Sequence, residues 1–350
     1  MKRAGFVELA AAAGVSLATV DRALNGRQKV RRETLDHIAA VARRIGHPAA
    51  LRFGGAEQAL RPKIRFGVAL HKQGQDFYRA FADALNAGVG AETTVQGQLV
   101  LEFSTSQAPS EMARLMRSMA GRCDVLAATA VDHPEVTSAV EDLRAGGMAV
   151  FALLSDFAPA ARTGYLGLDN LKVGRVAGWM MARAVAFQAL GPGKLAVFVG
   201  GHRWKGHEQR DAGFRAWLRE AAAGLEVLET QVNLETRQLT YEATRTLLRA
   251  HPTLRGIYVA GGGMEGAIAA LREARVKGLV DGKVQLIVSA LTPESRRGLA
   301  EGLVTLTIDT PLPDLCRAMF ATMARAALSP APIRGESLYL PPVLSLPEML

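Results

Sequence analysis

The chain has 350 residues, of which 49% are hydrophobic and 21% are charged, so we expect a globular protein of about two or three folded units rather than a disordered chain. The formal net charge is +9, and the two cysteines, Cys123 and Cys316, stand far apart in apolar contexts, as buried thiols of a reducing compartment do. No apolar run approaches the roughly 18 to 20 residues of a membrane span, so we expect no membrane partner.

The first residues, MKRAGFVELAAAAGVSLA, imitate a secretory signal peptide, with two basic residues and a run of alanines. Glu8 interrupts the apolar core of that segment, and no convincing cleavage site follows. We therefore expect this segment to be folded and the protein to be cytoplasmic.

The positive charge is concentrated at the start of the chain. Residues 1–65 contain 13 Lys and Arg but five Asp and Glu, whereas the remaining residues nearly balance. A small basic region on a neutral body predicts a polyanion as the partner of that region alone. A solubilising basic tail is the alternative, but the apolar periodicity of the region argues against it.

Two short helices that cross at a tight turn are predicted in this basic region. Ala10 is small where the helices approach, and Gly14 can take the left-handed turn conformation. Val15 and Val20 fill the space between the helices. Ser16 is the expected N-cap of the second helix.

A third helix is predicted in RRETLDHIAAVARRIG, which Gly46 and Pro48 end. Its apolar stripe consists of Leu35, Ile38, Val41 and Ile45. Many structural helix hairpins share the spacing of the first two helices. Because the spacing coincides with the excess of positive charge, we interpret residues 1–47 as a helix-turn-helix that binds double-stranded DNA.

The second helix of such a motif places short side chains against base edges in the major groove. Leu17 and Ala18 offer apolar contact, for instance to a thymine methyl, and Arg22 can donate to guanine or to phosphate. Thr19 and Asn25 are suited to the phosphate backbone. The predicted DNA-contacting residues of the motif are Ser16, Leu17, Ala18, Thr19, Arg22 and Asn25.

The segments VELAAAAGVSLATVDRALNG and VRRETLDHIAAVARRIGH resemble the LacI family of transcriptional regulators, and the resemblance extends over essentially the whole chain. It implies that Leu17, Ala18 and Arg22 are the base-reading positions. It also implies a linker, here residues 48–62, in which a hinge helix inserts a leucine into the minor groove. Two adjacent glycines in PAALRFGGAEQALRPK weaken such a helix. Leu51 is the predicted wedge, Leu60 is the alternative, and an ordered hinge helix is not assured.

From residue 63 to residue 350, apolar runs alternate with amphipathic helical stretches, which predicts parallel sheets with helices on both faces. The expected strands are IRFGVAL, LVLEFS, DVLAAT, AVFALL, KLAVFVG, GIYVAG, VQLIVSA and TLTI. The expected helices lie near residues 76–88, 109–120, 132–145, 169–190, 207–223, 238–250, 264–276, 293–301 and 312–328.

These strands are too many for one modest sheet, so we expect two doubly wound lobes with a ligand cleft between them, at the carboxyl ends of the strands. Gly164 to Gly167 is the expected crossing between the lobes. The predicted first lobe comprises residues 63–165 and 304–328, and the second comprises 166–303 and 329–350. The phrases YLGLDNLKVGRVAGWMM, GHEQRDAGF and GIYVAGGGMEGAIAAL resemble the ribose-type, periplasmic-binding-protein-like bodies of the family.

The resemblance places Arg210 where the family's arginine reaches ligand hydroxyls or carboxylates; a surface arginine is the alternative. Asp309 matches a polar ligand-contacting position, or else caps the helix from Pro311. Asp156 can accept from a sugar hydroxyl or start a turn. Phe77 falls where sugar receptors stack a ring on the ligand, and core packing is the alternative.

Gly261 and Gly262 are expected to bring backbone groups near the ligand. Family members of the lactose-binding kind carry Asn-Asp there, so those side-chain contacts are missing here. The stretch GGGMEG also satisfies the glycine pattern of dinucleotide sites, but the next strand ends in Ser289 and Ala290 rather than in the acid that would hold a ribose.

His202 and His207 invite a metal interpretation, but no partner cysteine or His-Glu-x-x-His helix accompanies them. No nucleophile elbow or catalytic triad pattern is present either. We therefore expect no metal, no cofactor and no enzymatic activity.

The sequence thus predicts a DNA-binding transcriptional regulator, in this family most often a repressor, that responds to a small polar ligand such as a sugar, a polyol or a sugar acid. One helix-turn-helix offers few base contacts, so a homodimer on a pseudo-palindromic operator is expected. A transport-type binding protein is the rival, but it would need an exported N-terminus and no basic helical region. An oxidoreductase is disfavoured by the missing ribose acid.

Overall fold

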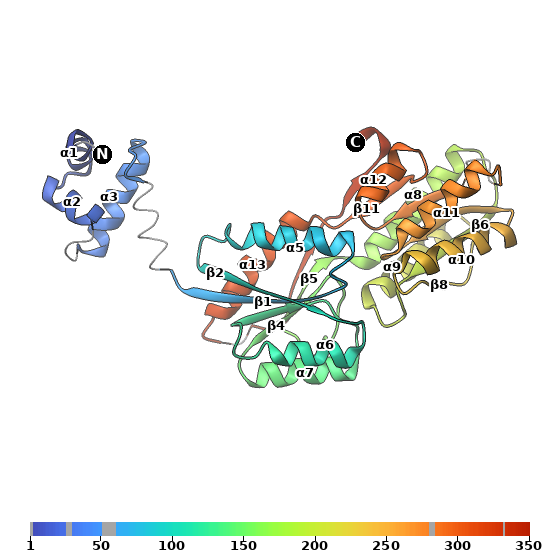
Figure 1. The fold of residues 1–350 in the computed structure, drawn as a ribbon, viewed down its shortest axis with the longest axis horizontal. Helices are drawn as coiled ribbons and strands as arrows, with labels where there is room; N and C mark the ends of the chain where they lie inside the picture. The colour runs from blue at the N-terminus through green and yellow to red at the C-terminus, as the bar shows by residue number, and fades with distance from the viewer. Residues whose placement is uncertain (1–2, 26–29, 51–60, 280–283, 332) are drawn as a thin grey trace. The chain divides into compact units, whose positions relative to one another are not determined.

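The computed structural model describes residues 3–25, 30–50, 61–279, 284–331 and 333–350 (Figure 1). The chain divides into two compact units, which we call the head (residues 1–63 with 93–96) and the body (residues 64–92 and 97–350). The predicted hinge residue Leu51 and its alternative Leu60 lie outside the described residues.

The head contains three helices in its described part: α1 (Arg3–Ala13), α2 (Leu17–Asn25) and α3 (Arg32–Arg44). Gly14 joins α1 to α2 with a φ of +64°, as the tight turn requires. The N-cap prediction is confirmed, because the Thr19 N–H donates to Ser16 Oγ at 3.1 Å. The buried core that unites the three helices includes Leu9, Ala10, Val20, Ile38, Val41 and Ala42.

The first lobe of the body is built on a parallel sheet in the order β12-β5-β4-β3-β1-β2. Its strands are β1 (Lys63–His71), β2 (Gln96–Ser104), β3 (Val125–Ala128), β4 (Ala149–Leu153), β5 (Gly164–Leu168) and β12 (Glu336–Leu340). The helices α5 (Asp76–Val89) and α13 (Leu312–Leu328) pack together on one face, and α6 (Pro109–Ser118) and α7 (Pro134–Ala145) on the other (Figure 1). Burial on both faces explains why the central strands read as continuous apolar runs.

The second lobe has the strand order β13-β11-β10-β9-β6-β7, with β8 also paired to β6. The strands are β6 (Gly193–Val199), β7 (Leu225–Val227), β8 (Gln231–Val232), β9 (Leu254–Val259), β10 (Gln285–Val288), β11 (Leu306–Asp309) and β13 (Val343–Ser345). The helices α8 (Asn170–Phe187) and α9 (Lys205–Ala221) cover one face. The other face carries α10 (Arg237–Ala250), α11 (Met264–Val276) and α12 (Pro293–Ala300), and a short 3-10 helix, η1 (Pro347–Met349), follows β13.

Two details of the predicted lobe division are wrong. The expected crossing at Gly164 to Gly167 is part of strand β5, which pairs with β4 and β12 inside the first sheet. Strand β11 belongs to the second sheet beside β10, and β12 belongs to the first sheet. The reason is that α12 returns β11 to the edge of β10, so the chain leaves the second lobe only after β11.

Among the described residues, three connections therefore run between the lobes. The first joins β5 to α8, the second joins β11 to α13, and the third joins β12 to β13. Pro341 and Pro342 form the third connection, where two successive residues without an N–H cannot continue the sheet pairing. These crossings bring the carboxyl ends of both parallel sheets to the same region of the body.

Candidate functional site

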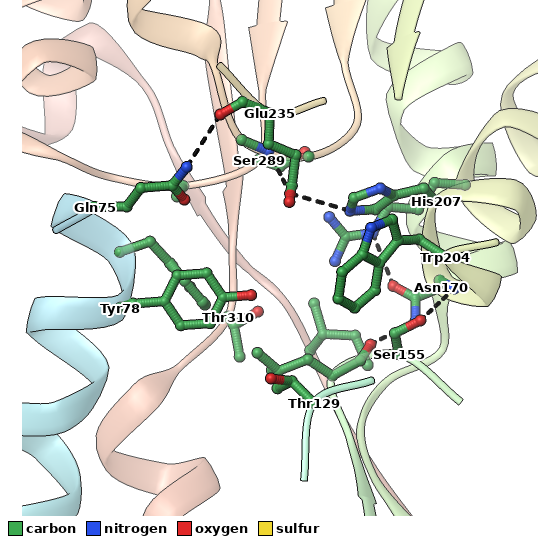
Figure 2. Close-up of a pocket in the computed structure, with 18 of the residues that line it drawn as sticks. Gln75, Tyr78, Thr129, Ser155, Asn170, Trp204, His207, Glu235, Ser289 and Thr310 are labelled. Carbon is green, nitrogen blue, oxygen red and sulfur yellow. Dashed lines mark hydrogen bonds and ion pairs between the residues drawn. The ribbon is translucent and has the colours of Figure 1, made fainter. Parts of the chain in front are cut away.

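A cleft lies between the two lobes of the body, where strands of both sheets end (Figure 2). It contains about 750 Å³ of space free of protein atoms, part of which is open solvent. Its walls follow β3, β4 and β5 in the first sheet and β9, β10 and β11 in the second. The lining residues are Gln75, Phe77, Tyr78, Thr129, Leu153, Leu154, Ser155, Leu168, Asn170, Trp204, Gly206, His207, Arg210, Glu235, Gly261, Gly262, Met264, Ser289, Ala290 and Thr310.

Arg210 lines the cleft from α9, as the resemblance predicted for a ligand-contacting arginine. Its Nε donates to Asn170 Oδ1 at 2.7 Å and its Nη1 donates to the Ala260 carbonyl at 2.9 Å. Asn170 is itself oriented, because its Nδ2 donates to the Leu154 carbonyl and to the Tyr165 hydroxyl, each at 3.1 Å. The guanidinium is therefore held by two groups of the second lobe, and one of them, Asn170, is itself bonded to the first lobe. No carboxylate is directly bonded to the guanidinium in the described residues.

Glu235 forms the second polar feature of the cleft, and sequence reasoning missed it. It lies between β8 and α10, and its carboxylate contacts three groups: the Lys72 ammonium on Oε2, and the Gly262 N–H at 3.0 Å and His207 Nε2 at 3.5 Å on Oε1. Burial lowers the pKa of Lys72 to about 7, and the ion pair with Glu235 acts against this shift by favouring the charged form. Glu235 stands in no recognised motif. The strand before it, β8, has two residues, which is too short to give a periodic signal in the sequence.

His207 lies beside Glu235 and is neutral. Its Nδ1 accepts a hydrogen bond from the Gly200 N–H at 3.2 Å, so the ring proton resides on Nε2, which faces Glu235. Burial, reinforced by the positive charges of Arg210 and Lys72, lowers the pKa of His207 to about 3. His207, for which the sequence offered no metal-binding partners, lies in the cleft wall.

Gly261 and Gly262 line the cleft, and the Gly262 backbone is bonded within the protein, its N–H to Glu235 and its carbonyl to Asn233. A Cβ at Gly261 would lie 2.6 Å from His207 Cε1 and 3.0 Å from Glu235 Oε1. A Cβ at Gly262 would lie 3.1 Å from Glu235 Cβ. The absence of side chains at these two positions leaves room for Glu235 and His207. The carboxylate in this wall of the cleft therefore comes from the loop between β8 and α10, and not from the loop after β9.

Aromatic rings and hydroxyls complete the lining. Phe77 lines the cleft, where the resemblance predicts a ring that stacks on the ligand, and it also packs against the core of the second lobe. The Phe77 and Tyr78 rings lie edge to face, with their centroids 5.3 Å apart. Trp204 is 5% exposed, and its Nε1 donates to Gln107 Oε1 at 3.3 Å. Figure 2 shows Tyr78 and Gln75 on one side of the cleft and Trp204 and His207 on the other.

The structure places Asp156 and Asp309 outside the cleft lining. Arg162 holds the Asp156 carboxylate in an ion pair, with Nη2 2.8 Å from Oδ2. Asp309 accepts from the Thr310 N–H at 2.9 Å, and burial raises its pKa to about 6. Asp309 also does not cap α13, because the residue at that helix start is Pro311.

The predicted DNA-contacting residues lie on or just before α2 in the head. Ser16, Leu17, Ala18, Arg22 and Asn25 are exposed, and Leu17 retains 42% of its accessible surface. Thr19 is half-buried and shares a 2.8 Å hydrogen bond with Ser16. Arg22 Nε donates to the Ala18 carbonyl at 3.1 Å, and Asn25 Nδ2 donates to Asp21 at 2.7 Å. Leu17 and Arg22 are thus exposed on the same short helix, as their predicted base contacts require.

The described ranges contain neither a metal-binding cluster nor a membrane-spanning helix. There, no group of three or more His, Cys, Asp or Glu side chains is arranged to hold a metal ion. In the same part of the chain, no helix has the length and apolarity needed to cross a membrane.

Comparisons with known proteins address each unit. Residues 7–48 match the model of bacterial regulatory proteins of the lacI family, and residues 66–329 match that of the periplasmic binding protein domain. No curated protein sequence matches the chain. Among solved structures, an ABC transporter periplasmic solute binding protein from Actinobacillus succinogenes 130z with bound D-allose is 18% identical, with a TM-score of 0.71, and the match covers 83% of this chain and 99% of that one.

Two further solved structures show the same fold. A glucose-galactose binding protein from Geobacillus stearothermophilus is 18% identical with a TM-score of 0.70, covering 83% of this chain and 99% of that one. An ABC transporter solute binding protein from Burkholderia graminis C4D1M in complex with D-arabinose is 20% identical with a TM-score of 0.70, covering 81% and 96%. At these identities the likeness shows the two-lobed fold alone.

Proposed function

Because the chain belongs to the lacI family of bacterial regulatory proteins, with a body of the periplasmic binding protein domain, we propose that it is a DNA-binding transcriptional repressor controlled by a small carbohydrate-like ligand. One observation carries the proposal: a helix-turn-helix with an exposed second helix is joined in one chain to a body with a cleft between two lobes. The protein acts by binding rather than by catalysis.

The cleft supports a carbohydrate-like ligand. It offers a fixed guanidinium, several hydroxyls and the aromatic rings of Tyr78 and Trp204, which together suit a compact polyhydroxy compound. The solved structures of the same fold described above bind D-allose or D-arabinose, or are named for glucose and galactose. A sugar, a polyol or a sugar acid is therefore the proposed effector class.

A ligand in the cleft acts on DNA only if it binds the lobe arrangements with different affinity, because equal binding shifts nothing. The coupling is reciprocal, so operator DNA changes ligand affinity by the same factor by which the ligand changes operator affinity. We propose that the protein works as a homodimer held by the body, because two heads are needed to read a pseudo-palindrome. Sedimentation of residues 62–350 at micromolar concentration tests this, and a strict monomer would contradict it.

Selection from random double-stranded DNA with the full chain tests DNA binding. A pseudo-palindromic sequence should be enriched, and Arg22→Ala should weaken binding to it by about 1–3 kcal/mol if Arg22 contacts a base. Arg249→Ala, which removes one exposed positive charge from α10 in the body, is the control and should bind as the wild type does. Unchanged affinity and sequence preference in Arg22→Ala would remove Arg22 from the reading surface.

Thermal-shift screening with sugars, polyols and sugar acids tests the effector. In the presence of a stabilising compound, Arg210→Ala should keep operator binding near the wild-type level while losing most of the response to the compound. Arg249→Ala again serves as the control of equal charge change. If Arg210→Ala lost operator binding but responded normally to the compound, the cleft assignment would be wrong.

A further inference from the structure

The loop between β8 and α10 is held to the first lobe by side chains of that lobe. The Lys72 ammonium, which follows β1, forms an ion pair with Glu235. Gln75 Nε2 donates to the Glu235 carbonyl at 3.0 Å (Figure 2), and Gln107 Nε2 donates to the Leu234 carbonyl at 3.4 Å. We call these five residues the clasp. Since the two halves of the clasp lie on different lobes, the lobes cannot separate here without breaking it.

Gln107 extends the clasp to a second loop of the second lobe. While its amide nitrogen donates to Leu234, its Oε1 accepts from Trp204 Nε1 at 3.3 Å. Next to this contact, the Asp132 N–H donates to the Arg203 carbonyl at 3.1 Å. Trp204 also lines the cleft, so the contacts that join the lobes surround the same cavity that the ligand is proposed to occupy.

The ion pair of the clasp is shielded from water and is asymmetric. The Lys72 and Glu235 side chains retain 11% and 9% of their accessible surface. Glu235 has two further partners inside its own lobe, Gly262 and His207, and these stay in place if the lobes part. Lys72 has Glu235 as its one ion-pair partner in the described residues. The Glu235 carboxylate is therefore held in position by its own lobe, and a separation of the lobes would break only its contact with Lys72.

The backbone of the clasp is strained on both lobes. Lys72, Leu234 and Glu235 have φ values of +53°, +49° and +54°. L-residues with side chains rarely adopt this left-handed region, and they persist there when surrounding contacts impose it. These three strained residues therefore lie where the lobes meet, at the contacts of the clasp.

We propose that the Lys72–Glu235 pair is a latch that holds the two lobes of the body together, and that a ligand enters or leaves the cleft through its opening. Both Glu235 oxygens contact protein donors, one of them from the first lobe, so the carboxylate joins the two lobes. The ligand part of this inference rests on the proposed function, whereas the latch itself is a property of the lobes and is measurable without ligand or DNA.

The test measures the distance between the lobes in the full chain. Spin labels are attached through Ser118→Cys on α6 and Ala250→Cys on α10, which are exposed positions of different lobes, while the native Cys123 and Cys316 are buried. Pulsed electron paramagnetic resonance then gives the distance distribution without DNA or sugar. Lys72→Met and Glu235→Gln should each increase the population with separated lobes about fivefold or more, and the double variant should exceed neither by much, because both remove one interaction.

Controls separate a latch from general damage. Arg175→Met removes an ion pair within the second lobe, that with Glu220, and should leave the distances unchanged. Lys72→Arg should restore the wild-type distribution, because it keeps the charge. If Lys72→Met does not fold, a second variant remains. Gln107→Leu removes the hydrogen bonds of Gln107 to Leu234 and Trp204, and it should still shift the population toward separated lobes. Wild-type distances in both Glu235→Gln and Gln107→Leu would overturn the proposal, whatever the outcome of the DNA and sugar experiments.

Discussion

At the scale of single residues, the cleft depends on positions where a side chain is missing. Gly261 stands where a Cβ would overlap the His207 ring and crowd the Glu235 carboxylate. Sequence reasoning assigned this glycine to close contact with a ligand. The structure shows another reason for a glycine here: the space that a side chain would need is filled by His207 from α9 and by Glu235 from the loop after β8.

Gly261→Ala should therefore destabilise the body by about 1–3 kcal/mol, as added atoms do in a packed site. Urea unfolding followed by circular dichroism measures the change. Gly90→Ala is the matched control, because Gly90 has a φ of −77° and a Cβ there would meet no atom within 4 Å. Equal midpoints for the two variants would contradict the packing of His207 and Glu235 described above.

A second prediction at this scale concerns how the stability of the fold depends on pH. Burial holds the pKa of His207 at about 3 and that of His71 at about 4, below the ordinary value of 6.5. The unfolded chain therefore binds more protons below pH 6.5, and stability falls as the pH is lowered, by about 2 kcal/mol per histidine between pH 7 and pH 5. Asp309 opposes this, because its raised pKa of about 6 makes protonation below pH 6 favour the folded state.

His207→Gln should show a shallower loss of stability between pH 7 and pH 5 than the wild type, since glutamine does not titrate. Denaturant midpoints at pH 7, 6 and 5 provide the comparison. His202→Gln, at an exposed position of the preceding loop, should keep the wild-type slope. A wild-type slope in His207→Gln would mean that His207 is not the buried neutral group that its contacts indicate.

The site could be predicted from sequence only in part. Arg210, Gly261, Gly262 and Phe77 were found because they stand in phrases that resemble a family, and all four line the cleft. Glu235 was missed because β8 has two residues and gives no periodic signal. Asp156 was misplaced because a sequence does not show that Arg162, six positions later, holds its carboxylate.

At the scale of elements, α8 and α9 owe their close contact to glycines. A Cβ at Gly174 would lie 2.0 Å from the Arg210 carbonyl oxygen, and one at Gly213 would lie 2.1 Å from the Leu171 carbonyl oxygen. A Cβ at Gly178, one turn further along α8, would meet the Phe214 carbonyl oxygen at 3.0 Å. The backbones therefore touch near Arg210, and this contact sets how far Arg210 reaches into the cleft.

Replacing a helical glycine with alanine ordinarily stabilises a helix by about 1 kcal/mol. Gly174→Ala should do the opposite and lower the unfolding midpoint, because it forces α8 away from α9. Gly178→Ala should have a smaller effect, in keeping with the larger space at that position. A thermal melt of both variants tests the order, and stabilisation by Gly174→Ala would show that the helices are not in backbone contact there.

Most elements of the body were predictable because parallel strands buried on both faces are long apolar runs. The strands that escaped prediction have particular causes. β5 contains two glycines and was interpreted as a connection, and β12 alternates exposed and half-buried residues at a sheet edge. An edge strand such as β12 is defined by the strand beside which it lies in space. The order of strands along the chain does not reveal which strand that is.

At the scale of the whole molecule, the net charge of +9 resides mainly in residues 1–65. If about six phosphates are contacted, affinity for DNA should fall by about 10³ between 50 and 200 mM salt, because binding releases condensed counterions. Fluorescence anisotropy with the full chain measures the slope. Residues 62–350, which lack most of this charge, should show no operator binding, and binding by that fragment would refute the division of labour proposed here.

The strands β12 and β13 are neighbours in sequence, yet they complete the edges of two different sheets. On the ribosome, neither lobe has its full set of strands until residues 336–345 have emerged. The helices of the head are complete by residue 44, which is roughly 15–60 s earlier at ordinary rates of translation. The helices of the head are thus complete in each nascent chain before the body is. A ribosome that stalls before residue 336 leaves the outer edges of β5 and β11 open to pairing with another chain.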